Sequence, residues 1–204
     1  YQERLRRFCA IRPPGHHAEY DYAAGFCIFN NIAIAAKYLQ VEHGLKKIAI
    51  VDWDVHHGNG TQHTFERDKT VLYISTHQYP HYPGTGARSE RGKGEGEGYT
   101  LNFPMPAGSG EPEYLDVFKN QIVPALIKFE PEIILISAGF DAHNADPLSY
   151  IGLTSESYYK FTILLKQVAN EFCGGRMIAF LEGGYDLEAL ASSVDMMMRG
   201  FIED

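Results

Sequence analysis

The chain has 204 residues, of which 45% are hydrophobic and 22% are charged, and its formal net charge is −8. This length suffices for one sizeable α/β domain, and the composition is that of an ordinary globular protein. The acidic balance excludes a general nucleic-acid binder, which needs a basic face, and no apolar run approaches the roughly 18 residues of a membrane span.

Apolar runs with two different periodicities predict the secondary structure. Short continuous runs between turn residues predict strands, at residues 8–11, 47–52, 70–75, 99–103, 132–137 and 176–181. Apolar residues at helical spacing predict helices, at residues 30–43, 61–66, 111–129, 155–172 and 187–201. Pro124 should kink the third helix, and the Gly-rich residues 76–98 should form a long loop. Strands that alternate with helices predict an α/β fold, a parallel sheet flanked by helices, in a single domain over residues 1–204.

Two acidic residues and a histidine follow predicted strands in a pattern typical of a metal site. Asp54 and His56 come just after the strand at residues 47–52, and residues i and i+2 of an extended segment point to the same side. Asp141 follows the strand at residues 132–137 and should reach the same point from a neighbouring strand end. One imidazole and two carboxylates leave a position open for water, as a catalytic divalent ion requires. An ion pair or a strand-end cap would explain Asp54 and His56 alone, but the second carboxylate favours a metal.

A pair of histidines lies on a rigid turn. His16 and His17 follow two prolines and a glycine, which neither continue a strand nor start a helix easily. Adjacent histidines are most often a surface pair, but this context favours a general base and its electrostatic or acid partner. Asp52 is interpreted as the residue that orients a histidine, and His57 as structural.

Aromatic residues supply a candidate electrophile and candidate pocket walls. Tyr185 follows two glycines after a predicted strand, and its phenol could hydrogen-bond a substrate carbonyl and the oxyanion formed from it. The alternative is a core tyrosine, as most tyrosines of this chain should be. Phe26 follows Gly25, and Tyr82 lies in the Gly-rich loop. Their rings could form a narrow channel for a linear aliphatic chain, although ordinary packing explains them equally well.

Four short segments occur in one order along the chain: RPPGHH at residues 12–17, DWDVHHGNG at 52–60, GFDAH at 139–143 and EGGYD at 182–186. Together they resemble the zinc-dependent histone deacetylase family of the arginase-deacetylase superfamily, with its bacterial histone-deacetylase-like amidohydrolases. The match runs over residues 12–199. It implies a three-layer fold, in which helices flank a parallel sheet.

The resemblance also implies roles for the polar residues of these segments. The implied zinc ligands are Asp54, His56 and Asp141. His17 is implied to be the general base, with His16 as its electrostatic partner, and Tyr185 to polarise the substrate carbonyl. Asp52 pairs with His16 in this scheme, and Asn59 pairs with His17. Class I enzymes carry an aspartate where many class II and bacterial ones carry asparagine, so Asn59 indicates the class II type and a less basic His17.

Substrate and potassium sites are implied as well. The walls of an acyl-lysine tunnel correspond to Gly25, Phe26 and Tyr82. Leu148 corresponds to the position at the pocket mouth where acetylpolyamine-selective members carry a glutamate. A potassium ion beneath the zinc site corresponds to Asp52, Asp54, His56, Ser75 and the carbonyl of Thr76. A second monovalent ion site corresponds to Phe65, Asp68, Val71 and Tyr99.

The leading interpretation is zinc-dependent hydrolysis of acyl amides, most simply acetyl, of lysine side chains in proteins or peptides. The alternative is a deacylase of acetylpolyamines or other small amides, against which Leu148 argues because a carboxylate there would attract a second ammonium. A catalytically incomplete acyl-lysine-binding module is disfavoured by the presence of His17 and Tyr185. A binuclear manganese ureohydrolase would need further bridging carboxylates, which the motifs lack.

The expected setting is a reduced compartment. Cys9, Cys27 and Cys173 are far apart and odd in number, which predicts free thiols of a cytoplasmic protein. We expect neither nucleic acid nor a membrane as a partner. Domains of the resembled family are longer than this chain, so we expect it to lack the N-terminal part of that fold. Bare sheet edges would then favour self-association, with a homo-oligomer as the outcome.

Overall fold

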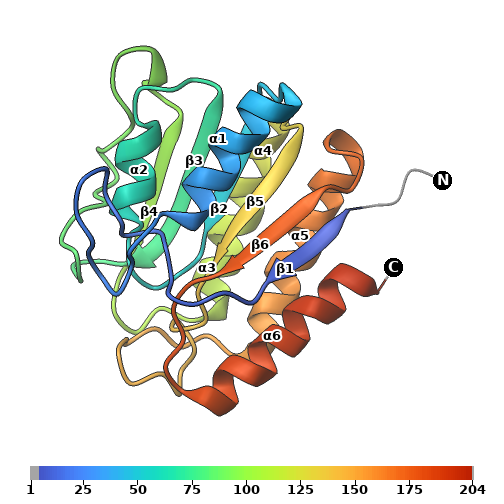
Figure 1. Cartoon of the computed structure of the whole chain (residues 1–204). Coiled ribbons are helices and arrows are strands. Elements are labelled where there is room, and N and C mark those ends of the chain that lie inside the picture. The colour runs from blue at the N-terminus through green and yellow to red at the C-terminus, as the bar shows by residue number, and fades with distance from the viewer. Residues whose placement is uncertain (1–4, 204) are drawn as a thin grey trace.

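Six parallel strands form one sheet in the structure, a computed structural model that describes residues 5–203 (Figure 1). The strands are β1 (Arg6–Cys9), β2 (Ile48–Asp52), β3 (Val71–Gln78), β4 (Thr100–Met105), β5 (Ile133–Ala138) and β6 (Met177–Leu181). Their order across the sheet is β1-β6-β5-β2-β3-β4, and every neighbouring pair is parallel. The predicted parallel sheet is confirmed.

Helices cover both faces of this sheet, which makes three layers. One face carries α1 (Asn31–His43) and α2 (Asn59–Phe65), which share a core with alternate residues of the central strands. The other face carries α3 (Glu111–Val117), α4 (Val123–Phe129), α5 (Ser155–Phe172) and α6 (Leu187–Ile202). A 3₁₀ turn (Gly94–Gly96) and a π-helical segment (Phe118–Ile122) complete the elements. Among the residues that the structure describes, no helix is long and apolar enough to cross a membrane.

Strand β2 shows why the central strands are continuous apolar runs. Ile48 and Ile50 belong to the core beneath α1, whereas Ala49 and Val51 belong to the core beneath α5, and all four are fully buried. Alternate residues of a strand point to opposite faces of the sheet. A strand that is covered on both sides therefore needs an apolar residue at every position.

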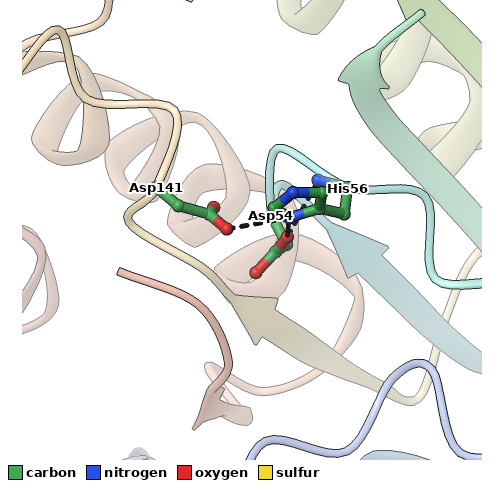
Figure 2. A group of neighbouring side chains, drawn as sticks. All are labelled: Asp54, His56 and Asp141. Atoms are coloured by element: carbon green, nitrogen blue, oxygen red, sulfur yellow. Dashed lines mark hydrogen bonds and ion pairs between the residues drawn. The ribbon is translucent and has the colours of Figure 1, made fainter. Parts of the chain in front are cut away.

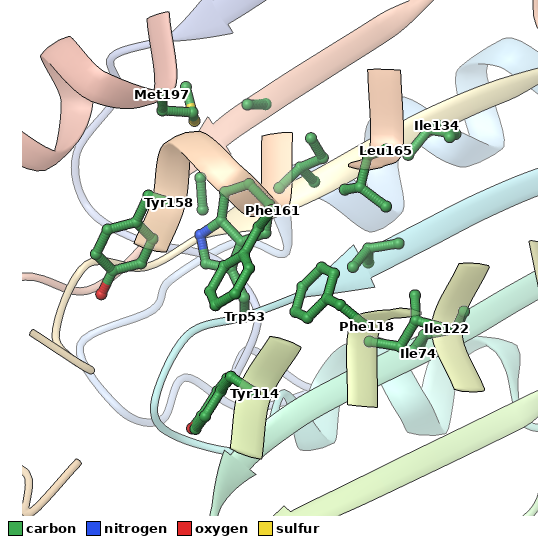
Figure 3. Packing of buried hydrophobic residues seen from close by; sticks show 14 of the residues in the cluster. Trp53, Ile74, Tyr114, Phe118, Ile122, Ile134, Tyr158, Phe161, Leu165 and Met197 are labelled. Carbon is green, nitrogen blue, oxygen red and sulfur yellow. The ribbon is translucent and has the colours of Figure 1, made fainter. Parts of the chain in front are cut away.

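Trp53 anchors the carboxyl end of β2 in the larger of the two cores (Figure 3). Its ring centroid lies 6.1 Å from that of Phe161, which stacks on Phe118 with centroids 4.2 Å apart. Removal of such a buried ring typically costs about 3–5 kcal/mol of folding free energy. Packing on this face therefore holds the backbone between Asp52 and Asp54 in place.

The predicted boundaries of β1 and β3 were wrong for different physical reasons. Strand β1 comprises Arg6–Cys9 and not residues 8–11, because the Ile11 amide donates to the Cys9 carbonyl at 2.9 Å and turns the chain out of the sheet. Strand β3 continues to Gln78, so the Gly-rich loop begins three residues later than predicted. Because residues 76–78 are polar, the sequence predicts a loop there, but these residues are buried and pair with β4.

The helix predicted at residues 111–129 is not one continuous α-helix. A π-helical segment at Phe118–Ile122 separates α3 from α4, just before Pro124. Proline has no amide hydrogen to donate to the carbonyl four residues earlier, and its ring crowds that carbonyl. A widened π turn before the proline relieves this conflict, so the predicted kink takes the form of a π segment.

Strands β2 and β5 lie side by side where the direction of the chain connections reverses. From β2 the chain proceeds outward to β3 and β4, and from β5 it proceeds in the opposite direction to β6. Open α/β sheets bind ligands in the crevice beyond the carboxyl ends of such strands. Asp54 and His56 follow β2 and Asp141 follows β5, so the topology brings these side chains together.

Candidate metal centre and pocket

Asp54, His56 and Asp141 form a compact group beyond the ends of β2 and β5 (Figure 2). Nδ1 of His56 lies 3.1 Å from Oδ1 of Asp54 and 3.0 Å from Oδ2 of Asp141. One potential ligand atom from each residue lies within 4.8 Å of the others. The structure thus brings together the three residues that the sequence predicts to bind a metal.

The charges of this group fit a divalent cation. Asp54 and Asp141 are 1% and 0% exposed, and among residues 5–203 neither pairs with a lysine or an arginine. Burial and the nearby charge of Asp54 raise the pKa of Asp141 to about 6. Burial lowers the pKa of His56, but its hydrogen bonds to the two carboxylates outweigh burial and raise that pKa to about 10. A divalent cation would replace the proton on this imidazole and offset both buried carboxylates, and this donor set is one that Zn²⁺ binds.

Backbone amides orient both carboxylates. The Gly183 amide donates to Oδ2 of Asp54 at 2.8 Å, and the Val55 amide donates to Oδ1 of Asp141 at 2.9 Å. A Cβ atom on Gly139 would collide with the Asp54 carboxylate, and one on Gly183 would collide with Asp141. The site thus requires glycine in two of its motifs because the backbone passes directly against the carboxylates.

The two adjacent histidines have different partners and different protonation. Nδ1 of His16 lies 3.0 Å from Oδ2 of Asp52, and Nδ1 of His17 lies 2.7 Å from Oδ1 of Asn59. Burial lowers the pKa of His16, but the charges of Asp52 and Asp54 outweigh it and raise that pKa well above its usual range. Burial and the charge of His16 lower the pKa of His17 to about 3. Environments that separate the pKa values of neighbouring groups in this way are typical of an acid and a base.

A pocket of about 300 Å³ opens beside these groups. Its lining residues come from separate parts of the chain: His17, Gly25, Phe26, His56, Tyr82, Leu148 and Tyr185. The four residues predicted to contact substrate are all in this set, together with the predicted base and electrophile. The ring of Phe26 lies 6.0 Å from that of Tyr185, and the ring of Tyr82 lies 5.1 Å from that of His17, as centroid distances.

One wall of the pocket contains a non-glycine residue in a strained backbone conformation. Gly25 and Phe26 have φ angles of 53° and 65°, in the left-handed region that non-glycine residues rarely occupy. A Cβ atom on Gly25 would collide with the His17 ring, and the Phe26 side chain is 71% exposed. Strain of this kind persists where the surroundings impose it, most often at ligand sites. This conformation places the ring of Phe26 at the pocket, although the ring would be more favourably buried in the core.

Tyr185 contributes a phenol that keeps its proton. Burial, followed by the charges of Asp54 and Asp141, raises the pKa of Tyr185 far above its usual range. The side chain can therefore act as a hydrogen-bond donor toward an oxygen in the pocket at any physiological pH.

Glu182 is a site residue to which the sequence interpretation assigned no role. Its fully buried carboxylate accepts the amide hydrogens of Gly15 at 2.6 Å and His16 at 3.1 Å, and the hydroxyl hydrogen of Ser137 at 3.0 Å. It thereby ties the histidine turn to the ends of β5 and β6. Burial raises the pKa of Glu182 to about 7, although the charge of His16 opposes this. An acidic residue directly after an apolar strand, inside a motif, is the signal that could have identified it.

His81 and His57 differ in their relation to the metal group. His81 stacks on His56 with ring centroids 5.1 Å apart, and its Nε2 lies 3.0 Å from the carbonyl oxygen of Leu148. No pattern in the sequence distinguishes His81 from an ordinary loop residue. His57 turns away from the pocket, with Nε2 at 2.9 Å from Oε1 of Gln62, as a structural residue would.

The residues assigned to potassium fall into two separate groups. Ser75 is the register partner of Asp52 between β3 and β2, and both are fully buried. In the second group the Asp68 amide donates to the Phe65 carbonyl at 2.9 Å, and the Val71 amide donates to the Asp68 carbonyl at 3.3 Å. Potassium binding at either place stays a prediction.

Comparison with known proteins identifies the family. The family model described as histone deacetylase domain matches residues 2–201. The protein "Histone deacetylase 14, chloroplastic" of Arabidopsis thaliana is 52% identical over 195 residues, which are 96% of this chain and 46% of that protein. "Polyamine deacetylase HDAC10" of Homo sapiens is 44% identical over 200 residues, which are 95% of this chain and 29% of that protein. The solved structure "Crystal Structure of HDA15 HD domain" has a TM-score of 0.91 at 44% identity and covers 97% of this chain and 55% of that chain.

The chain spans about half the length, or less, of these curated relatives. Within that span, sequence identity and three-dimensional similarity agree over nearly every residue. The chain belongs to the histone deacetylase domain family.

Proposed function

We propose that this chain hydrolyses the acyl amide, most simply acetyl, of lysine side chains in proteins or peptides, with zinc as its metal. The observation that supports this most strongly is the aromatic-walled pocket, which contains His56 of the metal group, His17 and Tyr185. A lysine side chain has an apolar stem and carries its amide at the far end. Such a pocket buries the stem and presents the amide to the polar groups.

The proposed base is His17. A divalent ion held by Asp54, His56 and Asp141 would polarise the amide carbonyl and lower the pKa of an adjacent water molecule. His17 would take a proton of the attacking water at Nε2 as the water oxygen bonds to the carbonyl carbon, because Nδ1 of His17 faces the carbonyl oxygen of Asn59. A neutral imidazole at this position is ready to accept a proton.

Tyr185 and His16 support different steps of the proposed reaction. The phenol of Tyr185 donates a hydrogen bond that strengthens as the carbonyl becomes an oxyanion. His16, which Asp52 keeps protonated, adds positive charge beside His17 and favours proton return to the departing amine. His17 thus carries the proton, His16 supplies the neighbouring positive charge, and Tyr185 is the oxyanion donor.

A small acetylated polyamine is the second candidate substrate, because one relative is named a polyamine deacetylase. Such a substrate carries a further ammonium group, which a carboxylate at the pocket mouth would attract. Leu148 occupies the pocket lining here, and none of the seven lining residues that the structure describes is acidic. This supports a lysine amide over a polyamine.

The decisive experiment compares metal-stripped protein before and after the addition of one equivalent of Zn²⁺. An acetyl-lysine peptide and acetylspermidine are the substrates, and His17→Ala is the control that keeps the metal ligands. We expect zinc to restore turnover of the peptide in the wild type but not in the variant. Stoichiometric zinc binding without turnover would instead support an acyl-lysine-binding module. Faster turnover of acetylspermidine than of the peptide would support the polyamine hypothesis.

The ureohydrolase alternative, the potassium ions, the oligomeric state and the cellular location are separate from this proposal. One group of three residues among residues 5–203 can hold a metal ion, which does not support a binuclear manganese ureohydrolase. Potassium as a structural ion, a homo-oligomer and a cytoplasmic location stay predictions. Two relatives carry the word chloroplastic in their names, so compartment is best determined by localising the native protein.

A further inference from the structure

Asp146 is a buried carboxylate that contacts two pocket segments at once. It is 6% exposed and lies in the segment between β5 and α5. One carboxylate oxygen accepts the amide hydrogen of Leu148 at 2.9 Å, and the other accepts that of Tyr185 at 2.7 Å. Leu148 and Tyr185 both line the pocket. A single side chain therefore holds the backbone of two lining residues that lie far apart in the sequence.

Neither of these two residues is held by a helix or a strand. Leu148 lies in a connection without regular structure, and Tyr185 lies between β6 and α6, directly after Gly184 with a φ of 130°. A backbone amide in such a place needs a specific acceptor, because no ladder of hydrogen bonds supplies one. Asp146 is that acceptor for both amides.

The contact continues from Leu148 to the other wall of the pocket. The Leu148 carbonyl oxygen lies 3.0 Å from Nε2 of His81, which is the neighbour of Tyr82 in the chain. Tyr82 also lines the pocket, and it lies in the Gly-rich loop, outside any helix or strand. Asp146 thus begins a series of contacts that runs from Tyr185 through Leu148 to the loop that carries Tyr82.

We propose that Asp146 is a positioning residue, which holds the Tyr185 phenol and the Leu148 side chain at the pocket mouth in fixed positions relative to each other. The inference rests on the proposed function. Asp146 is not part of the metal group or the pocket lining, and both of its oxygens are engaged by amides. It therefore acts on turnover through Tyr185 and on the fit of the acyl chain through Leu148.

Substitutions of graded severity test this role. Asp146→Asn keeps the shape but leaves one oxygen for two amides, and Asp146→Ala leaves none. We expect kcat to fall about tenfold in the first and further in the second, because small misplacements of a reacting group have effects of this size. KM for an acetyl-lysine peptide should rise severalfold as well. Asp195→Asn makes the same change of charge on the exposed surface of α6 and should alter neither parameter.

A double-mutant cycle separates positioning from a general loss of stability. If Asp146 acts on kcat through the phenol, Asp146→Asn should lower kcat little further in a Tyr185→Phe background. The KM effect should persist there, because it passes through Leu148. Fully additive losses in kcat would overturn the proposed link to Tyr185.

Amide hydrogen exchange tests the same inference without any turnover. In metal-free protein, the Tyr185 and Leu148 amides should exchange about tenfold or more faster in Asp146→Asn than in the wild type, with α5 unchanged. Unchanged exchange at both amides would overturn the inference. A wild type that shows no zinc-dependent turnover would contradict the proposed function, whereas the exchange result would still decide the role of Asp146.

Discussion

His17 and Asn59 face each other at 2.7 Å, from Nδ1 to Oδ1, and both are buried. The amide nitrogen of Asn59 donates to Oε1 of Glu19, which turns the amide oxygen toward the imidazole. Nδ1 of His17 therefore carries the hydrogen, and Nε2 keeps its lone pair for a substrate proton. A neutral partner achieves this orientation without the charge that an aspartate would bring.

Removal of this partner should slow the reaction without loss of the metal. In Asn59→Ala the imidazole of His17 loses the acceptor that selects its tautomer. We expect kcat/KM to fall about tenfold to a hundredfold, as for other residues that orient an active-site histidine. Asn120→Ala, at an exposed position of the π-helical segment, is the matched control. An unchanged rate with bound zinc would mean that His17 does not depend on Asn59.

The phenol of Tyr185 should act mainly in the transition state. Tyr185→Phe removes one hydroxyl and leaves the ring packed against Phe26. We expect kcat to fall about a hundredfold or more with little change in KM, because the hydrogen bond strengthens only as the oxyanion forms. Tyr38→Phe makes the same change on the exposed face of α1 and should have no effect. A near-wild-type rate would exclude Tyr185 from the chemistry.

Zinc binding should stabilise the fold through the three proposed ligands. At a free zinc concentration about a thousand times Kd, the wild type should gain about 4 kcal/mol of unfolding free energy. Asp141→Asn should lose most of this gain, whereas Asp116→Asn on the exposed side of α3 should keep it. Thermal unfolding with and without zinc, together with the bound metal per chain, provides the measurement. An equal gain in Asp141→Asn would place the ion elsewhere.

The residue at the pocket mouth should influence the choice of substrate. Leu148 is 42% exposed, so a carboxylate placed there stays solvated and attracts a second ammonium group with about 1 kcal/mol. Leu148→Glu should therefore raise the ratio of kcat/KM for acetylspermidine over acetyl-lysine peptide by about fivefold. Leu148→Gln has a similar size without the charge and serves as the control. The same ratio in both variants would show that charge at this position does not select the substrate.

Glu182 should make the stability of the metal-free protein depend on pH. The pKa of Glu182 is raised from 4.5 to about 7 on folding. Its contribution to the free energy of unfolding is therefore complete below pH 4.5 and is lost as pH rises through 7. Glu182→Gln keeps an acceptor for the Gly15 and His16 amides and removes the titration. The variant should match the wild type near pH 4.5 and exceed it by about 3 kcal/mol near pH 8. Denaturant unfolding at the two pH values checks this, and parallel pH profiles would contradict it.

Local sequence patterns predict the strands and helices in their order, apart from the π-helical segment before Pro124, and they predict the three metal-binding candidates. Helix α5 spans Ser155–Phe172 as predicted, because Thr154 begins it with a capping interaction and an apolar face repeats along it. The candidates followed because Asp54, His56 and Asp141 stand directly after continuous apolar runs. Buried faces produce a periodic pattern of apolar residues, and strand ends produce a polar residue directly after an apolar run. Both patterns can be recognised in the sequence alone.

The contacts of Glu182 and Asp146 emerge only from the folded chain. The carboxylate of Glu182 holds the Gly15 amide across 167 positions of the chain, and Asp146 holds Tyr185 across 39. Such partners depend on the order of the strands and the path of the connections, and neither leaves a periodic pattern in the sequence. For the same reason the sequence predicts a loop at the polar end of β3, whose residues are buried and pair with β4. Composition does not record that contact.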